Sequence, residues 1–272
     1  MKNAGLLLVL TGLSNPVFAQ ANELDKNDFH LFNPTPRELW RPLSADRPDF
    51  TESPYTVDAG AVQLEMSFVN YASNGDEESW AYAQTNLKLG LLNNVDIQLV
   101  FTPYNSFDDG STTEYGLGDT QVRLKINLWG NDSGDTAFAI MPFIKFPTAS
   151  DDLGNDHVEG GVIFPFSTEI KEGVGLGLMF ETDFVYDETN DDYDAEFIGT
   201  GVFGFDVTDQ VGLYTEGIAI FSSNSDVDFR AILGVGVTYE IRKDLILDAG
   251  INVGLSGEAD DVNLFTGMTI RF

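Results

Sequence analysis

Few residues in this chain have the type and spacing that catalysis requires. Asp156 and His157 are adjacent, and such a pair can activate water for hydrolysis. The second histidine, His30, is far away in the sequence, and no G-x-S-x-G nucleophile motif occurs. The absence of cysteine excludes thiol nucleophiles, disulfides and cysteine-ligated metals. The sequence therefore predicts no enzyme, no cofactor and no metal centre, with an outer-membrane hydrolase as a remote alternative.

Two further segments resemble ligand loops in composition. Residues 187–194 carry many carboxylates, but they lack the central glycine and the final glutamate of a calcium loop. Residues 173–177 contain three glycines, but their spacing differs from that of a dinucleotide loop and they open an alternating strand. We interpret the acidic segments as a solvated rim, and whether they bind divalent cations is left open.

Charged residues that lie within otherwise apolar runs are the stronger signal. From Gly60 onward the chain alternates between apolar and polar residues, which is the period of a β-strand with two different faces. In a soluble sandwich the polar face would be solvated, whereas in a membrane barrel it would surround the lumen. The candidate lumen-lining residues are Glu65, Lys88, Asp96, Arg123, Lys125, Glu181, Asp183, Glu216, Arg230, Asp248 and Arg271.

The number and length of the runs favour the barrel. A tilted membrane strand needs about 9 to 11 residues, while strands of soluble proteins average about 5 to 6. The breaks alternate between tight turns and longer acidic loops, as in outer-membrane barrels. We predict an all-β protein, an antiparallel up-and-down transmembrane barrel of about twelve strands, with short periplasmic turns and longer acidic outer loops. The runs lie near 60–72, 79–91, 94–104, 117–130, 135–147, 159–170, 173–187, 195–207, 210–222, 227–240, 244–256 and 261–272.

The chain before the barrel divides into two parts. Residues 1–19 combine a lysine, a short apolar run and a small-residue ending, which predicts a Sec-type signal peptide. Residues 20–59 are rich in proline and follow no period, so we expect an irregular segment that either lies in the periplasm or enters the lumen as a plug. Residues 60–272 form the expected barrel in a Gram-negative outer membrane. The net charge of -30 repels phosphate backbones and excludes nucleic acid as a partner.

One segment before the first run carries a resemblance to a known family. The sequence Asp46-Arg47-Pro48-Asp49-Phe50-Thr51-Glu52 fits a D-R-P-D-x-T-E pattern, and it lies between a secretory signal and a glycine- and aromatic-rich barrel that ends in Phe272. In these features the chain resembles the MetA-pathway phenol-degradation transporter family. The resemblance implies an outer-membrane role linked to aromatic compounds. It names no substrate and transfers no binding residues.

We therefore expect a channel that takes up small, hydrophobic or aromatic compounds by passive diffusion. The alternative is a non-transporting structural or adhesive barrel whose acidic loops are the functional part. The expected partners are outer-membrane lipid and lipopolysaccharide, the small-molecule cargo, and the barrel-assembly machinery, which would recognise the C-terminal strand ending in Phe272.

Overall fold

The computed structural model describes residues 25–150 and 153–272, so the predicted signal peptide lies outside the described residues. Two short 3-10 helices, η1 (Lys26–Asp28) and η2 (Arg37–Leu39), precede the strands. In the described part of the chain, no helix has both the length and the hydropathy of a membrane-spanning helix. The strand segments are β1 (Val62–Asn74), β2 (Glu77–Tyr82), β3 (Thr85–Leu92), β4 (Val95–Phe101), β5 (Tyr104–Asp108), β6 (Thr113–Gly116), β7 (Thr120–Trp129), β8 (Thr136–Phe146), β9 (Glu159–Lys171), β10 (Val174–Asp187), β11 (Asp192–Asp206), β12 (Val211–Ser222), β13 (Arg230–Arg242), β14 (Leu245–Gly254) and β15 (Val262–Arg271).

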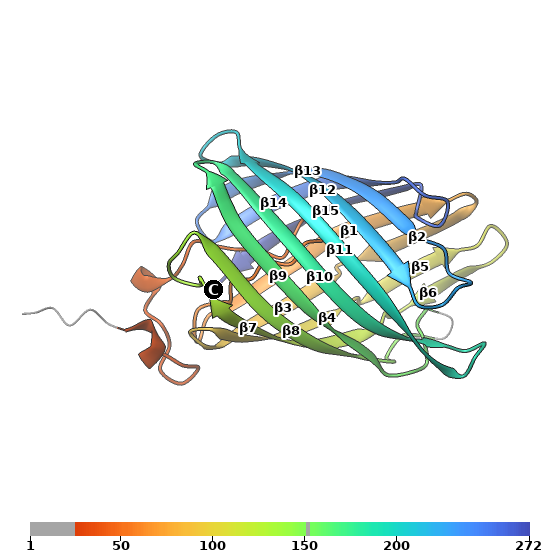
Figure 1. Cartoon of the computed structure of the whole chain (residues 1–272), viewed down its shortest axis with the longest axis horizontal. Coiled ribbons are helices and arrows are strands. Elements are labelled where there is room, and N and C mark those ends of the chain that lie inside the picture. The colour runs from red at the N-terminus through yellow and green to blue at the C-terminus, as the bar shows by residue number, and fades with distance from the viewer. Residues whose placement is uncertain (1–24, 151–152) are drawn as a thin grey trace, which may run out of the picture.

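These segments form one closed antiparallel barrel (Figure 1). When interrupted strands are counted as single strands, neighbours in sequence are neighbours in the sheet, and β15 pairs with β1 to close the ring. Three strands of the barrel are each interrupted once, so that β2 with β3, β4 with β5, and β6 with β7 each form a single wall strand. The barrel therefore has twelve strands, and the predicted fold class is confirmed.

The three interruptions lie in adjacent strands, and two of them have local causes. Ala83 adopts a left-handed φ of 53° between β2 and β3. Pro103, between β4 and β5, has no N–H to donate to the ladder. Beyond these breaks, β2, β5 and β6 extend the wall outward next to the end of β1. Much of the sequence expected as outer loops near 72–78 and 105–116 is therefore strand.

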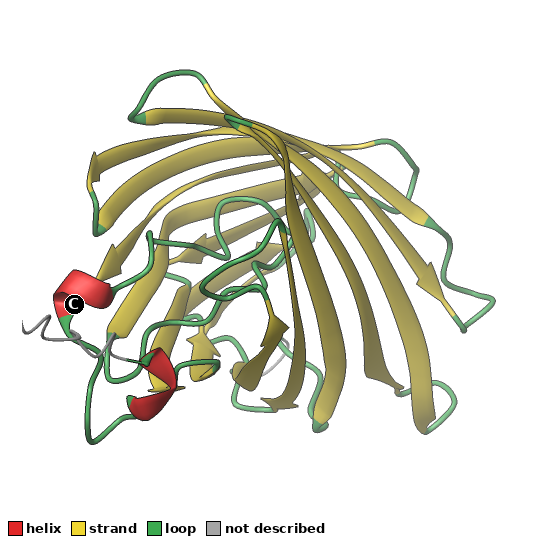
Figure 2. Ribbon diagram, turned by 60° about the vertical axis from the view of Figure 1, so that its left-hand side comes forward, coloured by secondary structure: helices red, strands yellow, loops and turns green. Residues whose placement is uncertain are grey.

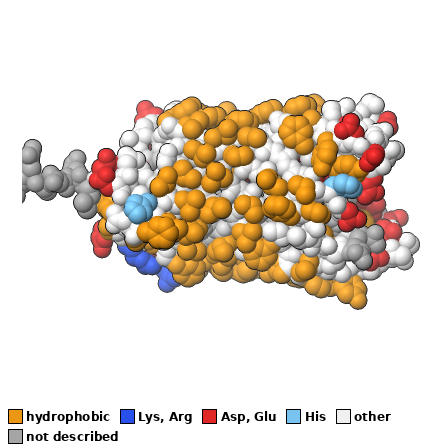
Figure 3. All heavy atoms as spheres, turned by 90° about the horizontal axis from the view of Figure 1, so that it is seen from below, with side chains coloured by type: hydrophobic (Ala, Val, Ile, Leu, Met, Phe, Trp, Pro, Cys, Tyr) orange, Lys and Arg blue, Asp and Glu red, His pale blue; other side chains and the backbone are white. Residues whose placement is uncertain are grey.

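The two faces of the wall differ as the alternation predicts. On β1, Gln63, Glu65 and Ser67 are buried inside the barrel, while Phe68 points outward and is exposed. Because the outward positions of the strands are mostly apolar, apolar side chains cover the outside of the barrel, as Figure 3 shows, and acidic side chains lie at its two ends, with more of them at one end. This apolar surface is the one that contacts membrane lipid.

The chain between the two short helices and β1 does not stay outside the barrel. Figure 2 shows coil inside the ring of strands. Residues 41–58 account for this coil, because their backbone and side chains bond to inward-facing groups of β1, β4, β7, β12 and β14. We call residues 41–58 the inner segment.

Candidate functional site

The inner segment is attached to the barrel first through Asp46. Its carboxylate accepts bonds from Lys125 Nζ at 2.7 and 2.8 Å and forms a close ion pair with Lys88. Glu65 also pairs with Lys88 and accepts a bond from the Asp46 backbone N–H at 3.1 Å. Burial alone would raise the pKa of Asp46, but the ammonium groups of Lys125 and Lys88 hold it well below its ordinary value. These buried charges compensate one another.

Arg47 and Glu52 make the next two attachments. Arg47 forms a two-point ion pair with Asp248 of β14, with Nη2–Oδ1 at 2.7 Å and Nε–Oδ2 at 3.2 Å. Glu52 pairs with Arg123 of β7 at 2.6 Å. Burial and the neighbouring Asp46 carboxylate raise the pKa of Glu52 to about 7, against the opposing effect of Arg123.

Glu216 of β12 holds the segment from the opposite side of the lumen. Its carboxylate accepts bonds from the backbone N–H groups of Phe50 at 2.8 Å and Thr51 at 2.7 Å, and from the Thr51 hydroxyl. The Thr51 hydroxyl also lies 2.6 Å from that of Thr200 on β11. The tip between Arg47 and Phe50 is therefore tied to the wall at both of its ends.

Asp49, within this tip, differs from its neighbours. Among the described residues it forms no ion pair, and its side chain makes no hydrogen bond to the wall. Burial and the nearby Glu216 carboxylate raise its pKa well above the ordinary value. The acidic residues of the D-R-P-D-x-T-E pattern are thus not equivalent, because Asp46 and Glu52 have cationic partners and Asp49 has none.

A second charged cluster, around the fully buried Asp58, closes the end of the barrel at which the inner segment begins. Lys26 bridges Asp58 at 2.8 Å and Asp132 at 2.7 Å. Arg41 lies 3.4 Å from Asp58 and 2.9 Å from Asp132, and Arg271 lies 3.6 Å from Asp58. This cluster joins the start of the inner segment to the turn after β7 and to the last strand.

The remaining candidate residues lie on the inner face without joining these clusters. Asp96 is buried and accepts bonds from the Val57 backbone N–H and from Gln98, each at 3.0 Å. Glu181 and Asp183 follow one another on the inner face of β10 and form no ion pair among the described residues. Arg230 pairs with Glu196 at 2.6 Å near the outer end. Five of the charged residues described above lie on β1, β3, β7, β14 and β15, on one side of the lumen. We call them the charged wall: Glu65, Lys88, Lys125, Asp248 and Arg271.

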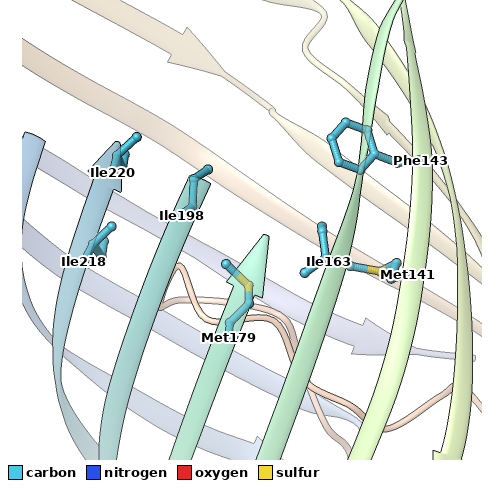
Figure 4. Packing of buried hydrophobic residues seen from close by; sticks show 7 residues of the cluster. All are labelled: Met141, Phe143, Ile163, Met179, Ile198, Ile218 and Ile220. Carbon is cyan, nitrogen blue, oxygen red and sulfur yellow. The ribbon is translucent and has the colours of Figure 1, made fainter. Parts of the chain in front are cut away.

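The opposite side of the lumen carries apolar side chains beside Glu181 and Glu216, which the alternating pattern does not predict. A buried cluster covers neighbouring strands from β8 to β12, and Figure 4 shows its side chains on the inner face of these strands. The feature of the sequence that could have predicted it is the loss of alternation in parts of β8 and β12, where successive residues on both faces are apolar. We call this cluster the apolar wall; its members are Met141, Phe143, Ile163, Met179, Ile198, Ile218 and Ile220.

Two cavities lie on either side of the tip of the inner segment. The outer cavity, of about 430 Å³, has residues 46–50 and Glu52 on one side and Ile163, Ile218 and Ile232 on another. The inner cavity, of about 480 Å³, includes Gly175 and Gly177 of β10, Gly204 of β11 and Gly212 of β12 in its lining. Arg47, Pro48 and Asp49 border both cavities. The tip is therefore the partition between them.

The residues considered for catalysis and cation binding do not converge. His157 stacks on Tyr186 with ring centroids 3.5 Å apart, and its imidazole bonds to no carboxylate among the described residues. Asp187 accepts bonds from Thr189 and from the Asn190 and Asn224 side chains. Within residues 25–150 and 153–272, no group of acidic or histidine side chains has the arrangement of a metal site.

Comparison with solved structures places this fold among outer-membrane barrels of bacteria. An outer membrane channel from Pseudomonas putida F1 is similar at a TM-score of 0.58 and 12% identity, with 84% of this chain and 100% of that chain covered. The NanC porin is similar at a TM-score of 0.53 and 10% identity, with 77% and 98% covered. At these identities the likeness concerns the fold alone.

Comparison of the sequence gives the family. None of the curated proteins with which the chain was compared matches it. A family model described as "Putative MetA-pathway of phenol degradation" matches residues 45–272, which begins one residue before Asp46 and includes the whole barrel. Because this match covers most of the chain, the protein belongs to the family of the putative MetA-pathway of phenol degradation.

Proposed function

We propose that the protein is an outer-membrane channel for the passive uptake of small hydrophobic or aromatic compounds, and that the inner segment is its plug. The observation that carries the proposal is the outer cavity, in which an apolar surface faces carboxylates across a space of about 430 Å³. A pocket of this size and mixed lining suits a solute with an apolar body and one polar group. The printed family description, which names phenol degradation, agrees with such a cargo.

The composition of the cavity also defines which solutes it favours. Asp46, Asp49, Glu52, Glu65, Glu181 and Asp260 line it, against only Arg47 and Arg123. Asp46 and Glu65 are compensated by Lys88 and Lys125, and those of the remaining carboxylates that are ionised repel anions by their electrostatic field. We therefore expect neutral or cationic solutes to enter in preference to carboxylates.

Single-channel recording in planar bilayers tests this proposal. The purified protein is compared with a variant that lacks residues 25–59. Discrete current steps from the intact protein support an open path, and steps that appear only in the variant support a plug that must move. Silence from both proteins, together with unchanged uptake of toluene by cells that express the protein, would contradict a transport role.

A non-transporting structural barrel is the second candidate, and one observation favours it. Lys88, Lys125, Glu65 and Asp46 are buried and mutually paired, so this side of the lumen holds the inner segment by charges that are costly to separate. Lipopolysaccharide and the barrel-assembly machinery are proposed partners under either function. The C-terminal Phe272 would be part of the assembly signal, and it pairs with Val62 through backbone N–H to O bonds of 2.8 and 3.3 Å.

A further inference from the structure

Several cavities follow one another along the lumen on the side of the apolar wall. A third cavity, of about 510 Å³, lies at the periplasmic rim between the turns that follow β9 and β11. It shares Gly173, Asp206, Gly212 and Thr238 with the inner cavity. Because the inner cavity in turn shares the tip of the inner segment with the outer cavity, the three spaces form one series from the outer half of the barrel to the periplasm.

Glycine at inward positions is what leaves the inner cavity open. Gly175 of β10 and Gly204 of β11 are paired across the two strands, and both line this cavity. No neighbouring heavy atom lies within 4 Å of the position that a Cβ of Gly204 would occupy. At Gly175 the nearest such atom is the Thr168 carbonyl oxygen at 4.0 Å. These two residues therefore border empty space and are not required by close packing.

The partition between the outer and inner cavities is hydrogen-bonded to the barrel at its two ends. Arg47 is held by Asp248, and Phe50 is held by Glu216 through its backbone N–H. Pro48 and Asp49, between these anchors, make no hydrogen bond to the barrel among the described residues. A displacement of this tip would join the two cavities without breaking the buried pairs of Asp46.

The charged wall offers a rival route that is closed more firmly. A cavity of about 680 Å³ lies beneath it and includes Ser44, Gln63 and Arg271 in its lining. This space shares only Tyr55 with the inner cavity. Above it, Asp46 forms buried ion pairs with both Lys88 and Lys125. A solute on this side would have to separate charges that have no access to water.

We propose that solutes cross the barrel beside the apolar wall, past the tip Arg47–Pro48–Asp49, which moves aside, and over the floor formed by Gly175 and Gly204. This inference rests on the proposed channel function and adds to it the position of the path and its gate. The Arg47–Asp248 ion pair is the latch of that gate. The solute class is the one that the outer cavity accommodates, namely a small apolar body with an uncharged or cationic polar group.

Cysteine substitution can test the path in the full-length protein, because the natural chain contains no cysteine. Gly204→Cys places a thiol in the inner cavity. Gly217→Cys is the matched control, because Gly217 faces outward from β12 and its Cβ position also has no neighbour within 4 Å. Ser44→Cys reports on the rival cavity. Each variant is incorporated into planar bilayers and treated from the outer side with a small cationic methanethiosulfonate reagent.

We expect the current through Gly204→Cys to fall by about twofold or more on modification, since an added group narrows the path at its floor. Reduction of the new disulfide should restore it, and the current through Gly217→Cys should not change. A decrease in Ser44→Cys without one in Gly204→Cys would place the path at the charged wall and overturn the inference. An unaltered Gly204→Cys current after labelling would overturn it as well.

A second readout separates this inference from the channel proposal. The extent of labelling is measured by the mass of each variant after treatment from the outer side. If neither the wild-type protein nor any variant conducts ions but Gly204→Cys is labelled faster than Ser44→Cys, the proposed position of the path is supported and the proposed ion conduction is not. If Gly204→Cys is not labelled, the path is wrong whether or not the wild-type protein conducts. Faster labelling in an Arg47→Gln background is expected, because that change removes the latch.

Discussion

The two sides of the lumen have the same strand geometry but opposite chemistry. The charged wall presents lysine, arginine and carboxylate groups that bond to the inner segment, whereas the apolar wall presents isoleucine, methionine and phenylalanine. Across from the charged wall the segment is held mainly through Glu216 and Thr200. A polar chain inside a barrel is therefore fixed where it finds compensating charges, and space remains beside it where the wall is apolar.

Neutralising Asp46 should have the largest effect, because it removes the main attachment of the inner segment to the charged wall. In Asp46→Asn, Lys125 loses its partner while remaining buried, and removing one member of a buried pair costs about 3 to 5 kcal/mol. We expect the backbone amides of residues 46–57 to exchange hydrogen at least a hundredfold faster, as measured by mass spectrometry. Asp49→Asn is the matched control, because Asp49 has no cationic partner among the described residues. Equal acceleration in both variants would show that the ion pairs do not fix the segment.

The docking of the inner segment should depend on pH through a second carboxylate, that of Glu52. The pKa of Glu52 is about 7 when the segment is docked, because burial and the Asp46 charge oppose its ionisation, and it returns towards the ordinary value of 4.5 on release. The docked state therefore binds the proton more tightly, so docking is fully favoured below the ordinary pKa and weakens as the pH rises towards 7.

The measurement is the protection of the same amides, corrected for intrinsic exchange, between pH 5 and pH 8. We expect between about tenfold and a hundredfold less protection at the higher pH, since a pKa of about 7 against 4.5 corresponds to roughly 3 kcal/mol at about 1.4 kcal/mol per pH unit. Asp49 contributes with the same sign, because its pKa is also raised. Glu52→Gln should make the protection depend less on pH. Protection that increases with pH would contradict this account.

On the apolar wall, a polar substitution should weaken solute binding without releasing the segment. Ile163→Thr places a hydroxyl beside the outer cavity and removes apolar surface, with a cost of about 1 kcal/mol for an apolar ligand. We expect the concentration of toluene that half-blocks the ion current to rise a few-fold. Ile144→Thr, on the outward face of β8, is the control. Equal effects of the two changes would argue against binding at the apolar wall.

The smallest effect is expected at the mouth of the outer cavity. Asp260 lines this cavity from the loop between β14 and β15. Asp260→Asn removes one carboxylate among several and should lower the preference for cations over anions by less than about twofold, because exposed charges are screened by salt. The reversal potential in a salt gradient measures this ratio. A larger loss would make Asp260, instead of the deeper carboxylates, the main determinant of selectivity.

Much of the architecture follows from local patterns in the sequence. The period-two alternation on β1 is sufficient to separate Glu65 from Phe68, because successive side chains of a strand point to opposite faces. The same rule gives the number of strands. It misses the apolar wall, because Met141 and Ile218 lie in runs where both faces are apolar and the period disappears.

The sequence by itself determined the strands, their inward and outward faces and the presence of an irregular segment before them, since these depend on residues adjacent in the chain. Only the tertiary structure decided which charges meet. Asp46 finds Lys125 and Arg47 finds Asp248 across separations of 79 and 201 residues, because closure of the barrel brings distant strands around one lumen. No pattern of neighbouring residues encodes such a pairing, because it depends on the position of the inner segment within the barrel.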